Sequence, residues 1–268
     1  MYGLEHDSIS PWSSKFWQFS VRHHGYSDFP AMLQVIRKDL RTSVIVVGQS
    51  QGALVAMLGL SKHTKLNKYI RLLCLISPAL VLRQPTNPLV KLIFEMNPSF
   101  LGDPLYLSFA SITQLFIPDW LATIGAFLAL RASGMSLLEF DRENNHVMAS
   151  TPSGYLPTSS MRFYVELLKK GPAFFKDSEN KIGGCNLSAI TAPVALWLGD
   201  QDVIIDDTKT IAVLNETVKL VYKNVLNGYG HTDSWYSKAS MVDLSPDVER
   251  IIEKGFQYNW RSPWLFNA

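Results

Sequence analysis

A serine lies between two glycines in residues 48–52, which read Gly-Gln-Ser-Gln-Gly. The β-branched run 43–47 leads directly into this pentapeptide, and the apolar stretch 53–60, which has the character of a helix, follows it. A strand, a tight turn of the form G-x-S-x-G and a helix together present a serine hydroxyl as a nucleophile at the end of the strand. We therefore predict that Ser50 attacks a carbonyl carbon. The backbone amide of Gln51, at the start of the helix, is predicted to stabilise the oxyanion that forms.

A nucleophilic serine needs a base to accept its proton. The sequence has six histidines, and only His231 follows a late predicted strand, within the loop 227–233. The other five precede the serine, end a helical stretch or lie in the middle of the chain: His6, His23, His24, His63 and His146. Because the base in this arrangement lies on a loop after a strand beyond the nucleophile, we predict that His231 is the base.

The base must in turn be oriented by a carboxylate. The third apolar run of the chain is followed by two candidates, Asp200 and Asp202, and spacing alone leaves both open. Asp206 and Asp207 are better suited to cap the next helix, where carboxylates accept hydrogen bonds from exposed amides. Asp233, two residues after the predicted base, either orients its loop or is a solvated turn residue.

Four apolar runs alternate with helical stretches, and these are the elements that must position the side chains. The predicted strands cover residues 43–47, 70–76, 194–198 and 218–225, and the predicted helices cover 29–40, 53–63, 206–216 and 244–255. Strands that alternate with helices form a parallel sheet with right-handed crossovers, which is an α/β fold. The alternation stops between about 81 and 180. We therefore predict three parts: a core segment with the nucleophile (1–80), a helical cap insertion over the strand ends (81–180), and a core segment with the acid and the histidine (181–268).

The predicted cap is most apolar between residues 104 and 130. Aliphatic and aromatic side chains fall on nearly every face of a helix there, whereas a surface helix has a single apolar stripe. Pro118 and Asp119 divide the segment into pieces shorter than the roughly 20 residues of a membrane span, so two apolar helices are favoured over a transmembrane hairpin. We predict that Phe116 and Trp120 line an apolar substrate groove that opens toward the nucleophile. The alternative is a helix buried beneath other cap segments.

The composition excludes several classes of protein. The 268 residues carry 25 basic and 23 acidic side chains, and no basic cluster would follow a phosphate backbone, so no nucleic-acid partner is expected. With 47% hydrophobic residues the chain is not disordered. Its two cysteines, Cys74 and Cys185, are too few for a disulfide framework or a zinc site, although a single bridge is open. Serine chemistry of this kind implies no metal and no cofactor.

These motifs resemble the acid lipase and steryl ester hydrolase branch of the α/β-hydrolases, the group that contains gastric and lysosomal acid lipases. The resemblance rests on five stretches: 10–20 (Ser-Pro-Trp-Ser-Ser-Lys-Phe-Trp-Gln-Phe-Ser), 28–31 (Asp-Phe-Pro-Ala), 48–52, 199–202 (Gly-Asp-Gln-Asp) and 230–233 (Gly-His-Thr-Asp). It is strong over 10–60 and 193–236 and weak across the predicted cap.

The resemblance implies an α/β-hydrolase fold with a catalytic triad of Ser50, Asp202 and His231, and it favours Asp202 over Asp200. It also implies hydrolysis of carboxylic esters of neutral lipids, either acylglycerols or steryl esters, and peripheral contact with a membrane or lipid-droplet surface. The sequence leaves the compartment open: a membrane- or lipid-droplet-associated location and a secretory or lysosomal-type location are both compatible with the resemblance. The first residues of the chain do not have the pattern of a secretory signal.

The chain departs from the family in two places. The histidine that usually precedes the nucleophile is Gln49 here. About a hundred residues that precede Ser10 in the family, with the first strands and the loop that completes the oxyanion hole, have no counterpart. We therefore expect a sheet whose N-terminal strands are missing, in which the strand ending at Gly48 is an edge strand. Two alternatives are open: a truncated, catalytically weak or inactive homologue, and the same fold acting on a soluble ester.

Overall fold

The computed structural model describes the chain in separate ranges. These are residues 6–40, 42–86, 91–92, 95, 157–175 and 185–257. The segment 104–130, with Phe116 and Trp120, lies outside the described residues, as does most of the predicted cap. No helix within the described ranges is long and apolar enough to cross a membrane.

The described residues form a parallel sheet whose strands are β1 (Val44–Gln49), β2 (Ile70–Ile76), β3 (Val194–Gly199) and β4 (Leu220–Leu226), in that order. Each strand lies where an apolar run predicted it, and all neighbours are parallel, which confirms the α/β fold. β3 is buried along its whole length, which explains why its sequence is continuously apolar. Within the described sheet β1 is an edge strand, as predicted, and Val47 on it is 51% exposed.

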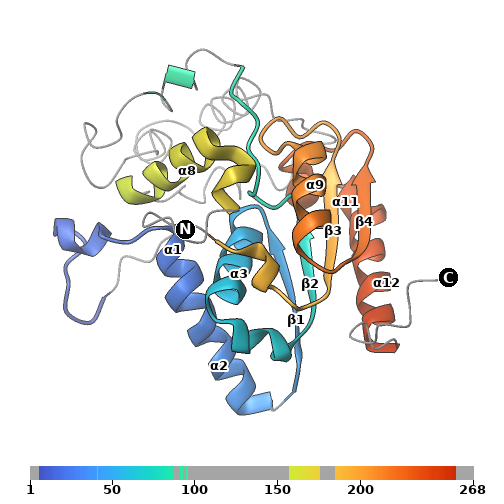
Figure 1. Ribbon diagram of the computed structural model, residues 1–268, viewed down its shortest axis with the longest axis horizontal. Helices are drawn as coiled ribbons and strands as arrows, with labels where there is room; N and C mark the ends of the chain where they lie inside the picture. Colours follow the sequence, from blue (N-terminus) through green and yellow to red (C-terminus); the bar gives the residue numbers. More distant parts are fainter. Residues whose placement is uncertain are drawn as a thin grey trace.

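Helices cover both faces of the sheet (Figure 1). The longer ones are α2 (Phe29–Leu40), α3 (Gln51–Lys62), α8 (Thr158–Lys170), α9 (Asp207–Thr217) and α12 (Leu244–Gln257). The short helical segments are η1 (Ser14–Trp17), α1 (Val21–His23), η2 (His24–Asp28), η3 (Thr64–Tyr69), η5 (Gly171–Phe175), η6 (Leu187–Ala189), α10 (Asp233–Tyr236) and α11 (Ala239–Val242). The four helices predicted from the sequence correspond to α2, α3, α9 and α12, with small differences at their ends.

Two apolar layers hold the helices to the sheet. Successive side chains of a strand point to opposite faces, so Leu72 and Leu73 of β2 enter different layers. Leu73 joins the layer that contains Leu54 of α3, whereas Leu72 packs in the layer that contains Val248 and Ile251 of α12. In Figure 1, α2 and α3 accordingly lie on one side of the strands and α12 on the other. The sheet is thus the rigid base on which the strand-end loops are mounted.

A carboxylate on α12 fixes that helix to β3 and β4. Asp247 accepts hydrogen bonds from Trp197 Nε1 at 2.8 Å, from the Tyr222 hydroxyl at 2.6 Å and from Asn224 Nδ2 at 3.1 Å, and it pairs with Arg250. Burial by itself raises the pKa of Asp247, but the hydrogen bonds from Tyr222 and Trp197 outweigh burial and hold this pKa at about 2. The ionised carboxylate therefore stabilises the folded state.

Helix α8 lies beyond the ends of the strands, over the start of α3 and the N-terminal segment (Figure 1). The hydroxyl of Ser159 donates to the carbonyl of Phe19, and Glu166 forms an ion pair with Arg22 at 3.6 Å. These contacts place one helix of the range predicted as a cap against the N-terminal part of the core. The division into core and cap stays a prediction, because most of 81–180 is outside the described residues.

Candidate active site

Ser50 occupies the turn between β1 and α3 in a backbone conformation that non-glycine residues rarely adopt, with φ 50° and ψ −115°. Main-chain hydrogen bonds hold this conformation. The Ser50 amide donates to the carbonyl of Ile76 at 2.9 Å, and the Ser50 carbonyl accepts from the amide of Ala79 at 3.1 Å. The end of β2 therefore supports the turn, and the strain is offset by neighbouring backbone rather than by the serine itself.

The two glycines that flank the serine differ in what they do. A Cβ on Gly48 would lie 2.7 Å from the amide nitrogen of Ala53, so only glycine lets β1 and α3 approach this closely. A Cβ on Gly52 would meet no atom of the described residues within 4 Å. Close packing of strand and helix therefore requires glycine at position 48 and, within the described part of the chain, does not require it at position 52.

The structure brings together the three side chains that the sequence analysis selected. Nε2 of His231 lies 2.8 Å from Oγ of Ser50, and Nδ1 of His231 lies 2.8 Å from Oδ2 of Asp202. The His231 and Asp202 residues are 7% and 2% exposed. Because an ionised carboxylate can only accept, Nδ1 carries the imidazole proton, and Nε2 is left to accept the hydrogen bond from the serine. This is the arrangement in which histidine can act as a base toward serine.

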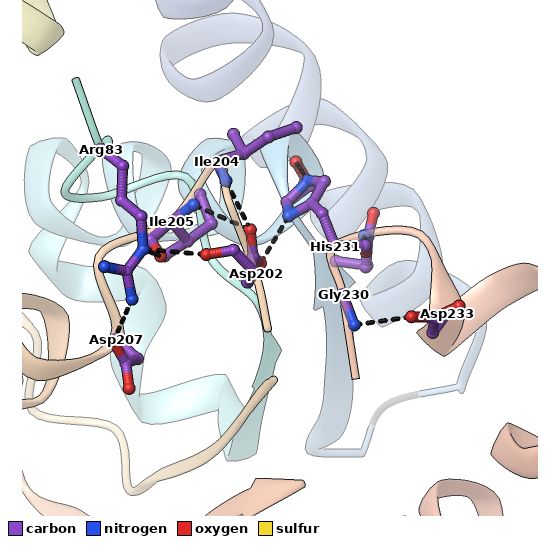
Figure 2. A network of polar contacts seen from close by, with 10 residues as sticks. Arg83, Asp202, Ile204, Ile205, Asp207, Gly230, His231 and Asp233 are labelled. Atoms are coloured by element: carbon purple, nitrogen blue, oxygen red, sulfur yellow. Dashed lines mark hydrogen bonds and ion pairs between the residues drawn. The ribbon is translucent and has the colours of Figure 1, made fainter. Parts of the chain in front are cut away.

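The second oxygen of the Asp202 carboxylate is also fully engaged. Oδ1 accepts hydrogen bonds from the amides of Ile204 at 2.8 Å and Ile205 at 2.9 Å (Figure 2). The carboxylate is thus held by its own loop on one side and faces His231 on the other. Its burial means that a loss of any partner would leave a charge or a donor unsatisfied.

The other acid candidate, Asp200, has a different partner. Its Oδ1 accepts from the amide of Gly228 at 2.6 Å, two residues beyond the end of β4. Asp200 therefore joins the loop after β3 to the loop that carries His231 without contacting the imidazole. The geometry supports Asp202 as the residue that faces the base, which is the choice that the family resemblance favoured.

Several contacts hold the loop of His231, and sequence reasoning anticipated one of them. Asp233 is 2% exposed and accepts from the amide of Gly230 at 2.6 Å, so it orients the loop and is not a solvated turn residue (Figure 2). The side-chain amide of Gln49 donates to the carbonyl of His231 at 3.2 Å, a role that the motif did not reveal. A Cβ on Gly199 would overlap the carbonyl of Tyr229, so this glycine permits the two loops to touch.

Gln51 begins α3, so its amide is among those that have no partner inside the helix. That position agrees with the predicted oxyanion donor, and the role itself stays a prediction. The side chain of Gln51 is held separately: its Oε1 accepts from the hydroxyl of Tyr164 at 2.6 Å, which links the start of α3 to α8. Nothing in the sequence pointed to Tyr164, because the contact joins positions far apart in the chain.

Neither cysteine takes part in the site. Cys74 and Cys185 are free and buried, so the bridge that the sequence left open is not formed. Burial raises the pKa of the Cys74 thiol to about 12 and that of the Cys185 thiol to about 11. Across the described residues, no group of three or more His, Cys, Asp or Glu side chains is placed to hold a metal ion.

The chain is similar in sequence to several known lipases. No protein-family profile matches the chain. Lipase member K of the mouse is 25% identical in an alignment that is 278 positions long and covers 96% of the chain and 69% of that protein. Gastric triacylglycerol lipase of the rat is 26% identical, in an alignment that covers 84% of the chain and 62% of that lipase. The rat lysosomal acid lipase/cholesteryl ester hydrolase is 22% identical, with coverages of 94% and 69%.

A solved structure identifies the fold. The monoglyceride lipase of Saccharomyces cerevisiae superimposes with a TM-score of 0.55 at 13% identity, covering 86% of the chain and 68% of that structure. The chain therefore has the α/β-hydrolase fold. Among proteins of that fold it is acid-lipase-like, because its relatives in sequence are lipase K and the gastric and lysosomal acid lipases. These relatives support a carboxylic ester hydrolase.

Proposed function

We propose that this protein hydrolyses carboxylic esters of neutral lipids through an acyl-enzyme. The observation that carries the proposal is the continuous hydrogen-bond chain from Ser50 through His231 to Asp202, at a strained turn between β1 and α3. Such a chain converts an unreactive hydroxyl into a nucleophile, because the proton has a prepared acceptor and the acceptor has a fixed orientation.

The first half of the reaction acylates the serine. Oγ of Ser50 attacks the ester carbonyl carbon as Nε2 of His231 takes the hydroxyl proton, and the carbonyl electrons move to oxygen. The amide of Gln51 stabilises this oxyanion. When the carbonyl re-forms, the bond to the alcohol oxygen breaks and His231 gives its proton to the leaving alcohol. Asp202 stabilises the imidazolium that exists between these two transfers.

The second half releases the acid. A water molecule attacks the acyl carbon while Nε2 of His231 accepts one of its protons. The bond to Oγ of Ser50 then breaks, and His231 returns the proton to the serine. The balance is one ester and one water in, one carboxylic acid and one alcohol out. Every proton moves through a single imidazole nitrogen, so no metal or redox partner is required by this sequence of steps.

The neutral-lipid class is supported by the names of the relatives and by the composition of the predicted cap. Triacylglycerol and cholesteryl esters appear in the names of two relatives. In this chain, the apolar segment 104–130 would supply a surface for acyl chains, with Phe116 and Trp120 on its wall. Contact with a membrane or lipid-droplet surface, and a secretory or lysosomal-type location, belong to the same proposal.

Chemical labelling tests the nucleophile directly. The protein is treated with a fluorophosphonate probe, and the labelled peptide is identified by mass spectrometry. We expect the label on Ser50, with loss of labelling in Ser50→Ala and normal labelling in Ser61→Ala. Ser61 is a matched control because its hydroxyl donates to the carbonyl of Asn186, outside the site. A protein that neither takes up the probe at Ser50 nor hydrolyses any ester would contradict the proposal and favour an inactive homologue.

Substrate class is tested with a pair of esters. We expect hydrolysis of a long-chain triacylglycerol or cholesteryl ester emulsion as well as of p-nitrophenyl acetate. Polar substitutions at Phe116 and Trp120 should reduce long-chain hydrolysis and spare acetyl hydrolysis. Equal loss of both activities would reject the predicted groove, and activity on acetyl esters alone would favour a soluble ester as the substrate.

A further inference from the structure

Arg83 lies directly beside the loop that presents Asp202. The main chain around it pairs with that loop: Leu82 and Ile205 form an antiparallel bridge, and the amide of Arg83 donates to the carbonyl of Ile204 at 2.8 Å. On the other side of the bridge, the amide of Asp206 donates to the carbonyl of Val81 at 2.8 Å. The backbone therefore fixes where the arginine side chain can reach.

The guanidinium of Arg83 spans the loop from one end to the other (Figure 2). Nε donates to the carbonyl of Asp202 at 2.8 Å and to the carbonyl of Ile205 at 2.9 Å. Nη2 donates to Oδ1 of Asp207 at 2.5 Å, which forms an ion pair at the start of α9. Asp207 thus pairs with Arg83, while Asp206 caps α9 by accepting from the amide of Lys209 at 3.0 Å.

These contacts bracket the two amides on which the Asp202 carboxylate depends. Ile204 and Ile205 donate to Oδ1, and the carbonyls of Asp202 and Ile205 are the ones that Arg83 holds. The loop has no regular helix or strand of its own between β3 and α9. A rigid, permanently charged fork with several donors is the side chain best suited to fix such a loop.

We propose that Arg83 is a positioning residue for catalysis. It holds the loop 202–207 so that Oδ2 of Asp202 stays aligned with Nδ1 of His231. The proposal rests on the proposed hydrolase function. It assigns Arg83 no contact with substrate, so its loss should slow the chemical steps without weakening substrate binding.

The experiment compares Arg83→Met, Arg83→Lys and the control Lys209→Met. Methionine keeps an unbranched apolar side chain without donors. Lysine keeps the charge but offers its donors from one nitrogen, without the fork. Lys209 carries a positive charge in the same region and pairs only with Asp206, at 2.8 Å, among the ion pairs of the described residues. Steady-state kinetics on p-nitrophenyl butyrate give kcat and KM, and thermal unfolding checks that each variant is folded.

A second readout does not depend on activity. A proton shared between an imidazole nitrogen and a carboxylate gives a resolved low-field ¹H NMR resonance, which His231→Gln assigns by its disappearance. In the wild type this resonance should be present even if the protein hydrolyses none of the esters. Its loss in Arg83→Met would therefore report on the Asp202–His231 alignment alone, which separates failure of this proposal from failure of the proposed function.

We expect Arg83→Met to lower kcat by about tenfold to a hundredfold, with KM changed less than about twofold, because small misalignments of catalytic groups have effects of this size. Arg83→Lys should lie between the wild type and Arg83→Met, and Lys209→Met should equal the wild type. The low-field resonance should be lost or broadened in the Arg83 variants. A folded Arg83→Met with wild-type kcat and resonance would overturn the proposal. If Arg83→Met does not fold, a folded Arg83→Lys with wild-type kcat and resonance overturns it equally.

Discussion

The side-chain amide of Gln49 donates a hydrogen bond to the main-chain carbonyl of His231 at 3.2 Å, so the strand that leads to Ser50 also holds the loop of His231. The acid lipases that the chain resembles usually have a histidine at this position, and here the glutamine provides the donor. Gln49 thus holds the main chain of the residue whose imidazole lies 2.8 Å from Oγ of Ser50.

Gln49→Ala should lower kcat/KM by about fivefold, because a hydrogen bond of about 1 kcal/mol that aligns the base is lost. Ester hydrolysis by purified variants measures this. Gln34→Ala, an exposed glutamine on α2, is the matched control and should equal the wild type. A Gln49→Ala protein with unchanged kcat/KM would show that the other contacts of the His231 loop are sufficient.

The two aspartates after β3 should respond very differently to amidation. Asp202→Asn should lower kcat by about 10³ to 10⁴-fold, because asparagine favours the wrong imidazole tautomer. Asp200→Asn should keep kcat within about tenfold, since its amide oxygen can still accept from Gly228. Initial rates on a soluble ester distinguish the two. A reversed order of the effects would move the acid role to Asp200.

The flanking glycines should tolerate alanine unequally. Gly48→Ala forces a Cβ against the backbone of Ala53 and should lower the free energy of unfolding by about 1 to 3 kcal/mol. Gly52→Ala lies within α3 and should be neutral or stabilising by up to about 1 kcal/mol, because alanine is the better helix former. Urea unfolding of both variants gives the comparison. Equal destabilisation would mean that Gly52 is also closely packed.

Asp247 should make stability depend on acid pH. Its folded pKa of about 2 lies below the unfolded value of about 3.9, so its contribution is complete above pH 4 and is lost as the pH falls through 2. Asp247→Asn should lower the free energy of unfolding at pH 7 by about 1 to 2 kcal/mol after allowance for solvent screening. It should also flatten the loss of stability between pH 4 and pH 2.

Denaturant unfolding at a series of pH values measures both effects. Asp39→Asn, which removes an exposed carboxylate from α2, is the control and should leave the curve unchanged. A variant whose unfolding free energy falls as steeply with acid as that of the wild type would show that other carboxylates account for the slope.

Local patterns in the sequence were sufficient to predict the sheet and to select two of the three side chains that meet at the candidate site. Apolar runs of strand length predicted β1 to β4, since strands buried on both faces have no polar alternation. Ser50 followed from the pentapeptide, and His231 from being the histidine beyond a late strand. Asp202 was different, because both it and Asp200 follow β3 closely. The sequence alone does not tell which of the two carboxylates faces the imidazole.

The contacts that hold the site were mostly invisible in the sequence. Arg83, Gln49 and Tyr164 act through hydrogen bonds to residues more than a hundred positions away, and no periodicity records such pairs. Asp233 was recognisable as a residue that could orient the loop only because it lies two positions after His231. The open space beside Gly52 also could not be anticipated, because the motif treats both glycines alike.

The separations along the chain within the triad have a consequence for how this protein can change. Asp202 and His231 are 29 positions apart, whereas Ser50 and His231 are 181 apart. Closing the longer loop costs only about 1.6 kcal/mol more than closing the shorter one, because loop entropy grows with the logarithm of length. The stretch between nucleophile and acid can thus be lengthened or rewritten at little thermodynamic cost. Selection can reshape whatever encloses the substrate while the reacting groups stay where the sheet puts them.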